Sequence, residues 1–182
     1  MSNINAAAGI WDIDTTHTNL GFSARHAMVA KVRGSFADYS GTFTIDGDNL
    51  ANSKAEITIQ AASISTGVAD RDGHLTSPDF LDVENFPTIT FVSTAVVAKG
   101  DDDVVITGDL TIHGVTKSVD VVYAFLGVSQ DPWGNSKVGF EGSTKISRKE
   151  FGLVWNAALE TGGVLVSDEI KLNLDVEGTK KA

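Results

Sequence analysis

One short polar stretch of this chain holds enough reactive residue types to resemble an active site. It places two carboxylates, a guanidinium and an imidazole within five positions, at Asp70, Arg71, Asp72 and His74. Carboxylates and imidazoles are the usual groups of acid–base catalysis. The spacing favours a structural role instead, on a loop or short helix where Asp70 and Asp72 cap backbone amides and Arg71 pairs with either carboxylate.

Other patterns that carry chemistry are missing. The four histidines lie on separate segments without the HxH or HxxxH spacing of a metal site, at His17, His26, His74 and His113. His17 lies next to Asp14, Thr15 and Thr16 and is expected to hold a turn together. Cysteine is absent, and so are the GxSxG, GxxxxGK and GxGxxG loops of hydrolases, nucleotide-binding and dinucleotide-binding proteins. We therefore expect a protein that is not an enzyme, with no catalytic residue, no metal site and no cofactor.

His26 and Arg148 are the polar residues best placed by sequence to meet a ligand. If side chains alternate from Leu20, His26 shares a face with Phe22. It would then either hydrogen-bond a ligand head group or serve as a satisfied core histidine. Arg148 follows Ile146 on the same side of a strand, so we expect it at one rim of a cavity. There it would meet a phosphate or quinone oxygen, or form a salt bridge with an acidic residue.

The candidate polar residues are expected to lie on β-strands or in the links between them. Apolar residues recur at every second position along much of the chain, which is the pattern of a half-buried strand. From Asp168 the chain reads DEIKLNLDVEG, with Ile170, Leu172, Leu174 and Val176 on one face. The same alternation predicts strands at 10–13, 20–32, 36–45, 54–59, 88–97, 106–112, 117–128 and 138–146. Short turn-rich links between these eight or nine strands imply antiparallel pairing.

Helical material is scarce. The stretch 67–85 could hold one or two short helices, with Ser77 as an N-cap and Pro78 at the first helical position. An apolar patch that could close one end of a barrel follows at Phe80, Leu81, Val83 and Phe86. A single helical turn is expected at 148–151.

A sheet of this many strands has to close or fold over, since its edges and its apolar face would otherwise meet water. Glycines inside strands, such as Gly108, Gly139 and Gly142, favour a barrel over a sandwich. They permit tight bends or leave room for another group near the wall. We predict an all-β antiparallel barrel of about eight strands. Leu110, Phe140, Leu172 and Leu174 should point inward, and Asp109, Glu141 and Lys171 outward.

Length and charge exclude several classes of protein. The chain has 182 residues, which suits one domain at 10–178, between a frayed start at 1–9 and a tail at 179–182. A net charge of −10 repels phosphate backbones and argues against a nucleic-acid partner. No apolar run approaches the about 20 residues of a membrane-spanning helix, so no stable membrane insertion is expected. No secretory signal is visible, so we expect a cytoplasmic protein, or a secreted one if the chain is a trimmed mature form.

Four blocks of sequence, in this order, closely resemble the YceI-like family. They are WDIDTTHTNLGFSARH from Trp11, SISTGVADRDGHLTSPDFLDVENFPTITFVST from Ser63, GDLTIHGVTKSV from Gly108 and ISRKEFGL from Ile146. The resemblance covers the chain from about Ile10 to Gly178. It implies a lipocalin-like barrel whose apolar interior holds a polyisoprenoid or other lipid chain, and a carrier, store or scavenger more than an enzyme. Many members of the family carry a secretory signal peptide, which this sequence does not show.

On this resemblance we expect one polyisoprenoid, isoprenoid quinone or fatty-acyl ligand per barrel, with its head near His26 or Arg148. Its chain would run along aromatic residues that could otherwise be plain core: Phe22, Phe36, Phe43, Phe91 and Phe140. Two alternatives remain open at this point. One is an enzyme acting on an isoprenoid or quinone within the barrel, and the other is a stress-related interaction module. A homodimer is compatible with the sequence.

Overall fold

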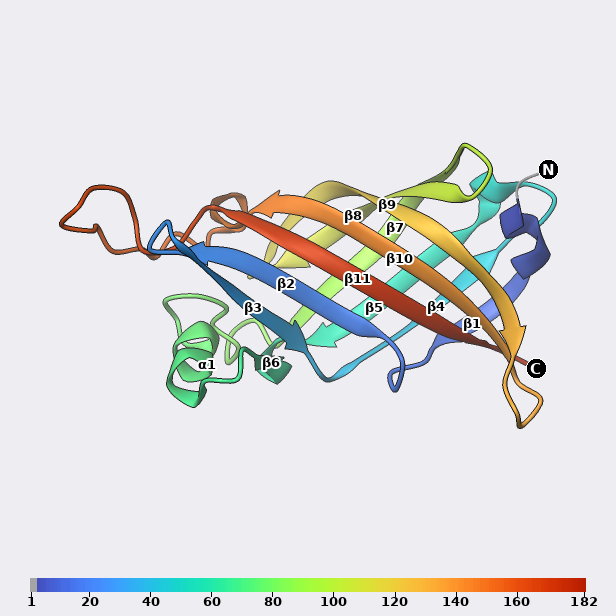
Figure 1. Ribbon diagram of the computed structural model, residues 1–182, viewed down its shortest axis with the longest axis horizontal. Helices are drawn as coiled ribbons and strands as arrows, with labels where there is room; N and C mark the ends of the chain where they lie inside the picture. The colour runs from blue at the N-terminus through green and yellow to red at the C-terminus, as the bar shows by residue number, and fades with distance from the viewer. Residues whose placement is uncertain (1–2) are drawn as a thin grey trace.

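The main feature of the computed structural model, which describes residues 3–182, is a closed antiparallel barrel (Figure 1). Within these residues eight strands form the closed wall, each hydrogen-bonded to the next. In spatial order they are β1 (Gly9–Ile13), β4 (Tyr39–Ile45), β5 (Lys54–Gln60), β7 (Thr88–Lys99), β8 (Asp103–Ile112), β9 (Val115–Gln130), β10 (Ser136–Ser147) and β11 (Glu169–Lys180). The barrel closes where Trp11 of β1 lies opposite Lys180 of β11. The predicted all-β antiparallel barrel is confirmed.

Three further strands extend the wall at one end. β2 (Asn19–His26) pairs with the first half of β11, and β3 (Ala30–Phe36) and β6 (Ile64–Ser65) follow beside it. β11 therefore pairs with β2 near its start and with β1 near its end. Figure 1 places the tips of β2 and β3 and α1 (Ala69–Thr76) at the end away from the chain termini. We call this the outer end, and the end with the termini the plugged end.

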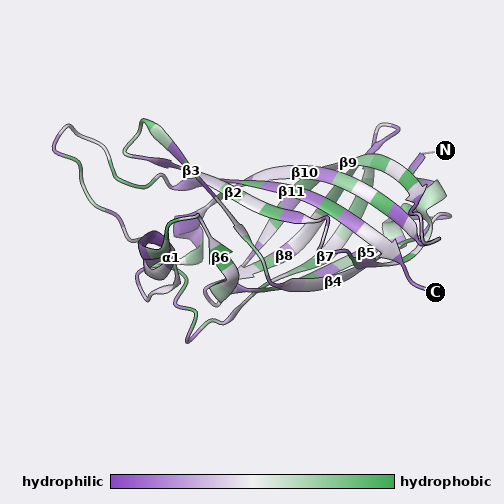
Figure 2. Ribbon diagram, turned by 60° about the horizontal axis from the view of Figure 1, so that its bottom comes forward, coloured by the Kyte–Doolittle hydropathy of each residue, from purple (hydrophilic) through white to green (hydrophobic). Residues whose placement is uncertain are grey.

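Side chains alternate between the two faces of the wall as the sequence pattern predicts. Leu110, Phe140, Leu172 and Leu174 face the interior, whereas Asp109, Glu141 and Lys171 are exposed. Figure 2 shows the alternation as apolar and polar bands along β9, β10 and β11. The predicted register is therefore correct, since a shift of one residue would have reversed every side chain.

The stretch 20–32 is not the single strand that we expected but the hairpin of β2 and β3. The turn lies at Ala27 and Met28, whose φ angles of 49° and 65° are left-handed. Hairpin turns with two left-handed residues usually contain glycine or asparagine, so nothing in the sequence marked this one. The stretch 36–45 is also divided, since β3 ends at Phe36 and β4 begins at Tyr39.

The α-helix of the 67–85 stretch, α1, ends at the point where we expected a helix to begin. Ser77 is its C-cap and not an N-cap, with an extended backbone and a hydroxyl that donates to the carbonyl of His74 at 2.6 Å. The physical reason is Pro78, because a proline disfavours helical geometry in the residue before it. The single turn predicted at 148–151 is present as the 3₁₀ helix η4 (Arg148–Phe151).

The remaining short helices are 3₁₀ turns: η1 (Asn3–Ala7), η2 (Leu50–Asn52) and η3 (Ala61–Ser63). η3 connects β5 to β6, so it links the two parts of the wall at the outer end. Across residues 3–182, no helix has both the length and the apolar character needed to cross a bilayer.

Residues 3–7, part of the stretch 1–9 expected to be frayed, form the helix η1, and residues 1 and 2 lie outside the described residues. Ile4 and Ala7 of η1 are 2% and 0% exposed, and the indole Nε1 of Trp11 donates to the carbonyl of Ala7 at 2.9 Å. This helix plugs the barrel, because its apolar side chains have no other place to avoid water. The tail expected at 179–182 also begins later, since Thr179 and Lys180 pair with β1 to close the wall.

The packed core is divided between the two ends of the barrel. One cluster surrounds the plug and consists of Ile4, Ala7, Trp11, Ile45, Val96, Val104, Val138 and Phe140. The other supports the outer end and consists of Ala61, Leu81, Ile89, Leu110, Ile112, Phe151 and Leu153. The most closely packed side chains therefore lie at the two ends of the barrel, and the interior between the two clusters is less tightly filled.

If η1 is a packed plug, Ile4→Ala should lower the free energy of unfolding by about 2–5 kcal/mol, the usual cost of such a truncation in a core. The matched control is Ile10→Ala, at a residue that is 49% exposed on β1, and it should change stability by no more than about 0.5 kcal/mol. Chemical denaturation measures both. Equal effects of the two substitutions would mean that residues 3–7 do not form a stabilising plug.

Candidate ligand-binding site

Two apolar cavities lie end to end inside the barrel. The inner cavity, about 180 Å³, reaches toward the plug at Ile4 and Ile45, and the outer cavity, about 480 Å³, reaches toward α1. Both are lined by Leu20, Ile59, Leu110, Leu172 and Leu174, so they share one section of wall. The outer cavity is also lined by the exposed residues His26 and Asp70, so it extends to the surface at the outer end.

All five phenylalanines predicted to line a channel do line one of these cavities. Phe43, Phe91 and Phe140 line the inner cavity, and Phe22 and Phe36 the outer one. The rings of Phe43 and Phe140 meet edge to face at 5.9 Å, and those of Phe22 and Phe36 lie 5.8 Å apart. The structure thus places all five at a cavity wall, and their contact with a ligand stays a prediction.

Aromatic rings lie over glycines of the inner wall at four places. The pairs are Phe22 with Gly34, Phe43 with Gly178, Phe91 with Gly108, and Tyr123 with Gly142. A Cβ atom at any of these glycines would overlap the ring. The rings can therefore lie against the wall, which leaves the centre of the barrel open. The sequence suggested this use for Gly108 and Gly142, whereas Gly139 meets only the side chain of Leu126 at 3.5 Å or more.

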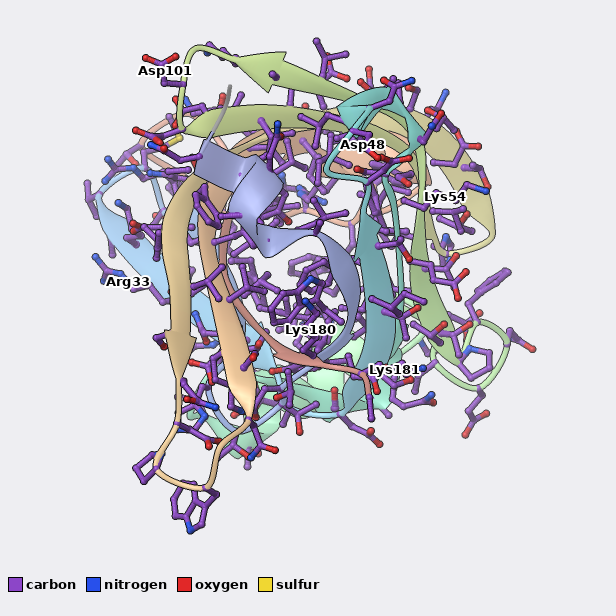
Figure 3. All side chains as sticks on the ribbon, turned by 90° about the vertical axis from the view of Figure 1, so that its right-hand side faces the viewer. Arg33, Asp48, Lys54, Asp101, Lys180 and Lys181 are labelled. Carbon is purple, nitrogen blue, oxygen red and sulfur yellow. The ribbon has the colours of Figure 1, made fainter. Side chains whose placement is uncertain are left out.

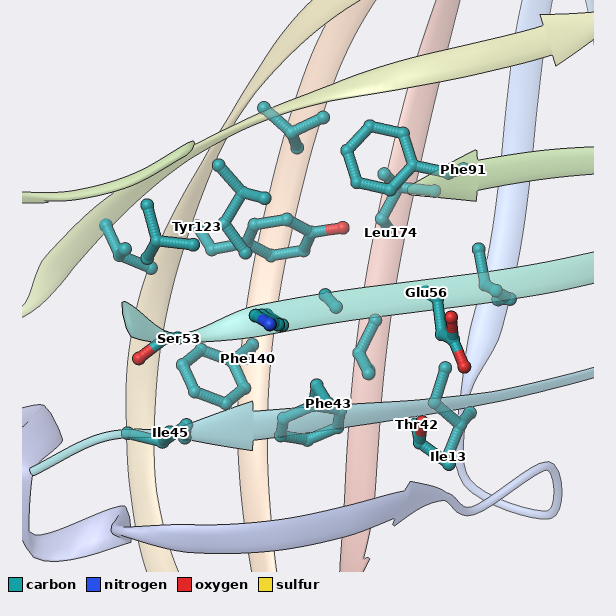
Figure 4. Close-up of a pocket in the computed structure, with 18 of the residues that line it drawn as sticks. Ile13, Thr42, Phe43, Ile45, Ser53, Glu56, Phe91, Tyr123, Phe140 and Leu174 are labelled. Carbon is teal, nitrogen blue, oxygen red and sulfur yellow. The ribbon is translucent and has the colours of Figure 1, made fainter. Parts of the chain in front are cut away.

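Tyr123 places one hydroxyl group in the inner cavity, and the sequence analysis did not single it out. Figure 4 shows this hydroxyl directed into the cavity, with Phe91 and Leu174 beside it and Phe140 nearby. No hydrogen bond within residues 3–182 involves it, although its ring packs edge to face on Phe140 at 6.4 Å. Burial raises the pKa of Tyr123 above its usual value, so the group stays protonated. The cavity thus contains a hydroxyl that is free to donate a hydrogen bond.

Arg148 lines the outer cavity, but its guanidinium is used by the protein itself. The group is 3% exposed and donates to four backbone carbonyls, those of Ser167 (2.8 Å), Leu153 (2.6 Å), Trp155 (2.8 Å) and Val166 (3.2 Å). Burial lowers the pKa of Arg148, and Asp168 opposes this effect. The hydrogen-bond partners of the Arg148 guanidinium are thus backbone carbonyls, and no acidic side chain is bonded to it directly. Arg148 fixes the loop 152–168 over the outer end.

His26 ends β2 and lines the outer cavity, as expected from its place on the face of Phe22. It is exposed, and its backbone bridges to Val166 of the loop 152–168. The structure therefore places His26 at the rim of the cavity and not in the packed core.

The polar stretch at 70–74 is mostly engaged in local order, in line with the structural interpretation. Asp72 accepts from the backbone N–H and the hydroxyl of Thr66 at 2.8 and 2.6 Å. Arg71 donates to the Thr66 hydroxyl at 2.7 Å and not to a carboxylate. His74 contacts Asp79 at 2.9 Å and packs on the ring of Trp155 at 4.6 Å.

One cluster of charged side chains at the plugged end was not predicted. Asp14, His17 and Glu177 bring together three atoms of the kinds that ligate metals, within 4.8 Å of one another. The ammonium of Lys137 already lies 2.6 Å from Asp14 and 3.4 Å from Glu177. The cluster is therefore a salt-bridge network with Lys137 as its cation. His17 holds the turn after β1, as predicted, through Asp14 at 3.2 Å.

Comparison with known proteins assigns the same fold. The sequence matches the YceI-like domain over residues 11–178. A UPF0312 protein of Shewanella denitrificans is 39% identical over 178 residues, 98% of this chain and 90% of that protein. A UPF0312 protein of Vibrio vulnificus is 37% identical over 177 residues, 97% of this chain and 89% of that protein.

Solved structures agree. BcnA of Burkholderia cenocepacia superposes with a TM-score of 0.77 at 25% identity, covering 91% of this chain and 98% of that one. The YceI protein of Campylobacter jejuni gives 0.74 at 31% identity, covering 87% and 90%. A polyisoprenoid-binding domain from Saccharophagus degradans gives 0.71, covering 94% and 98%. Its identity is 15%, so it supports the fold alone.

The salt-bridge network should make stability depend on acid pH. The hydrogen bond from Lys137 holds the pKa of Asp14 well below its usual range. A carboxylate with a depressed pKa stabilises the fold above its unfolded pKa of about 3.9, and this contribution is lost as the pH falls further. Between about pH 4 and pH 2, the free energy of unfolding should therefore fall more steeply in the wild type than in Asp14→Asn. Asp12→Asn, which removes an exposed partner of Lys181, should follow the wild type. Parallel curves for all three proteins would contradict this role of Asp14.

Proposed function

This chain belongs to the YceI-like family, and from that membership and its two adjoining cavities we propose that the barrel binds one long apolar lipid. The ligand is a polyisoprenoid, an isoprenoid quinone or a fatty-acyl chain, and the protein acts as its carrier, store or scavenger. The observation that carries this proposal is the mostly apolar lining of the two cavities, which share one section of wall between the plug and α1.

The shape and chemistry of the cavities suit such a ligand. Their volumes of about 180 and 480 Å³ together fall within the range of small-molecule sites. Burying about 500 Å² of a hydrocarbon chain at about 25 cal/mol per Å² gives roughly 12 kcal/mol before the loss of ligand freedom is subtracted. Most of the affinity would come from the chain, because aliphatic and aromatic side chains form most of the lining.

The polar groups of the site support binding more than catalysis. A general base or nucleophile needs a partner that activates it. Arg148 is occupied by backbone carbonyls and Asp72 by Thr66, and Tyr123 stays protonated. His74 has a carboxylate partner in Asp79, but its ring makes no hydrogen bond to a hydroxyl nucleophile within residues 3–182. An enzyme acting on an isoprenoid within the barrel is therefore the weaker candidate.

Tyr123 favours a ligand with an oxygen at its inner end. The hydroxyl faces open space in the inner cavity, so a ligand oxygen placed there gains a hydrogen bond that a pure hydrocarbon does not make. Three phenylalanines line the same cavity and offer ring faces to a planar group: Phe43, Phe91 and Phe140. An isoprenoid quinone meets both conditions, with its carbonyl at Tyr123 and its tail in the outer cavity. This orientation differs from the expected one, with the head near His26 or Arg148, because the donors of Arg148 are already used.

A bulky side chain on the section of wall that both cavities share should block a ligand from occupying the two cavities at once. Leu174→Trp places an indole where both cavities meet, and we expect it to weaken binding of a long polyprenyl chain at least about 10-fold. The control is Asp175→Trp, which adds the same ring on the exposed face of β11 and should bind as the wild type does. Displacement of a fluorescent fatty-acyl probe measures both.

Two results of these measurements would count against the proposal. If Leu174→Trp binds the long chain as well as the wild type, the path through both cavities is wrong. If the wild type takes up no chain, and mass spectrometry of its organic extract finds no lipid, the binding function itself fails.

Tyr123→Phe should remove the preference for an oxygen-bearing ligand. We expect the affinity for a short-tailed isoprenoid quinone to fall about 2- to 12-fold, the equivalent of one net hydrogen bond of about 0.5–1.5 kcal/mol. The affinity for a saturated isoprenoid hydrocarbon of the same length should stay unchanged, which serves as the control. An equal change for both ligands would indicate that the substitution acts on packing and not on a hydrogen bond.

A further inference from the structure

We propose that the outer end of the barrel is a docking surface for a lipid bilayer with anionic head groups. The surface consists of the β2–β3 hairpin, the stems of the loop 152–168 at Val154 and Val164, and the basic side chains of β2 and β3 beside them. The idea goes beyond ligand binding but rests on it in one respect: a bilayer is where a lipid would enter or leave the outer cavity.

Apolar side chains gather on the β2–β3 turn and on the stems of the loop 152–168, whose own tip turn at 159–163 carries the exposed acidic residue Glu160. Met28 and Val29 in the β2–β3 turn are 61% and 84% exposed, and Val154 and Val164 of the loop are 64% and 40% exposed. The two segments are joined, because the backbone N–H of Ala27 donates to the carbonyl of Leu165 at 2.8 Å. Figure 1 shows both projecting beyond the barrel at the outer end. Exposed apolar tips of this kind can insert among lipid head groups.

The turn holds these side chains in an unfavourable backbone conformation. Ala27 and Met28 both have left-handed backbones, with φ of 49° and 65°, a conformation that glycine and asparagine adopt at lower cost. A hairpin tip facing only water would also favour polar residues. Backbone strain and apolar exposure thus coincide at Met28, with the strained Ala27 before it and the exposed Val29 after it, and strained residues are common where a segment contacts a partner.

Basic side chains line the outer face next to this tip. Arg25 and Lys31 lie directly opposite each other on β2 and β3, and Arg33 and Lys171 flank Ser23 from either side. All four are exposed, and none takes part in an ion pair found within residues 3–182. Like charges directly opposite in a sheet repel each other, and an anionic surface would relieve that repulsion.

This patch is unusual for a chain whose net charge is −10. At the plugged end, which Figure 3 shows face on, acidic residues such as Asp48 and Asp101 are present, and Lys181 is paired with Asp12 at 3.2 Å. An acidic protein is repelled by an anionic bilayer in most orientations. The basic hairpin therefore favours an approach that brings the outer cavity to the lipid.

A rival apolar residue allows the choice of surface to be tested. Trp133, at the tip of the β9–β10 hairpin, is 84% exposed. It belongs to the plugged end, since β10 begins beside the last residues of β11. If Trp133 is the membrane anchor, the protein would dock with its outer cavity turned away.

Co-sedimentation of the full chain with vesicles tests the proposal. Wild type should bind vesicles of phosphatidylcholine with phosphatidylglycerol, lose binding as salt rises, and bind pure phosphatidylcholine weakly. Lys31→Glu with Arg33→Glu should lower binding at least about 25-fold, since each basic residue at an anionic surface contributes a factor of about 5. Met28→Asp with Val29→Asp should lower it at least about 10-fold. The controls are Lys99→Glu with Lys181→Glu, an equal charge change at the plugged end, and Trp133→Asp; both should bind as the wild type does.

A second readout separates docking from ligand binding. The docking variants should melt like the wild type and take up a lipid added from ethanol, but acquire it more slowly from vesicles. Failure of the wild type to bind anionic vesicles, or loss of binding in Trp133→Asp alone, would overturn the docking surface and leave the cavity proposal intact. Vesicle binding without any lipid uptake would support docking while contradicting the proposed function.

Discussion

The open interior of this barrel depends on contacts between aromatic rings and glycines of the inner wall. Inward side chains normally fill a barrel of eight strands. Here Phe22, Phe43, Phe91 and Tyr123 each lie over a glycine, where the absence of a Cβ lets the ring approach the backbone. A larger residue at the glycine would push the ring toward the centre of the barrel. The contact between ring and glycine therefore covers the backbone of the wall with apolar surface and keeps the centre of the barrel open.

The two ends of the barrel then acquire different roles. At one end η1 brings Ile4 and Ala7 into contact with the core around Trp11, and this end is closed by that packing together with the hydrogen bond from the Trp11 indole to Ala7. At the other end the loop 152–168 is held by hydrogen bonds from Arg148 to its carbonyls. The outer end is therefore covered by a loop that Arg148 and the backbone bridge between His26 and Val166 hold in place.

Sequence patterning could predict the wall but not its ends. A period of two determines which side chains face inward, and for that reason the position of Phe140 and the other channel phenylalanines was predictable. The turn at Ala27 and Met28 carries no turn-forming residue, and the plug depends on a tertiary contact with Trp11. The partners of Arg148 are backbone carbonyls, which every residue has. The network of Asp14 and Lys137 joins positions 123 residues apart, beyond the reach of local spacing rules.

The distribution of bonded and unbonded polar groups favours one orientation of the proposed ligand in the barrel. Arg148 lies at the outer end with its donors used, while the Tyr123 hydroxyl lies in the inner cavity without a partner. A ligand with a hydrogen-bond acceptor is therefore expected to bind with that acceptor in the inner cavity at Tyr123 and with its apolar tail nearer the rim. The exposed tip at Met28 and Val29 lies at that same rim. A lipid could thus leave a bilayer head first while its tail stays in contact with apolar surface along the whole path.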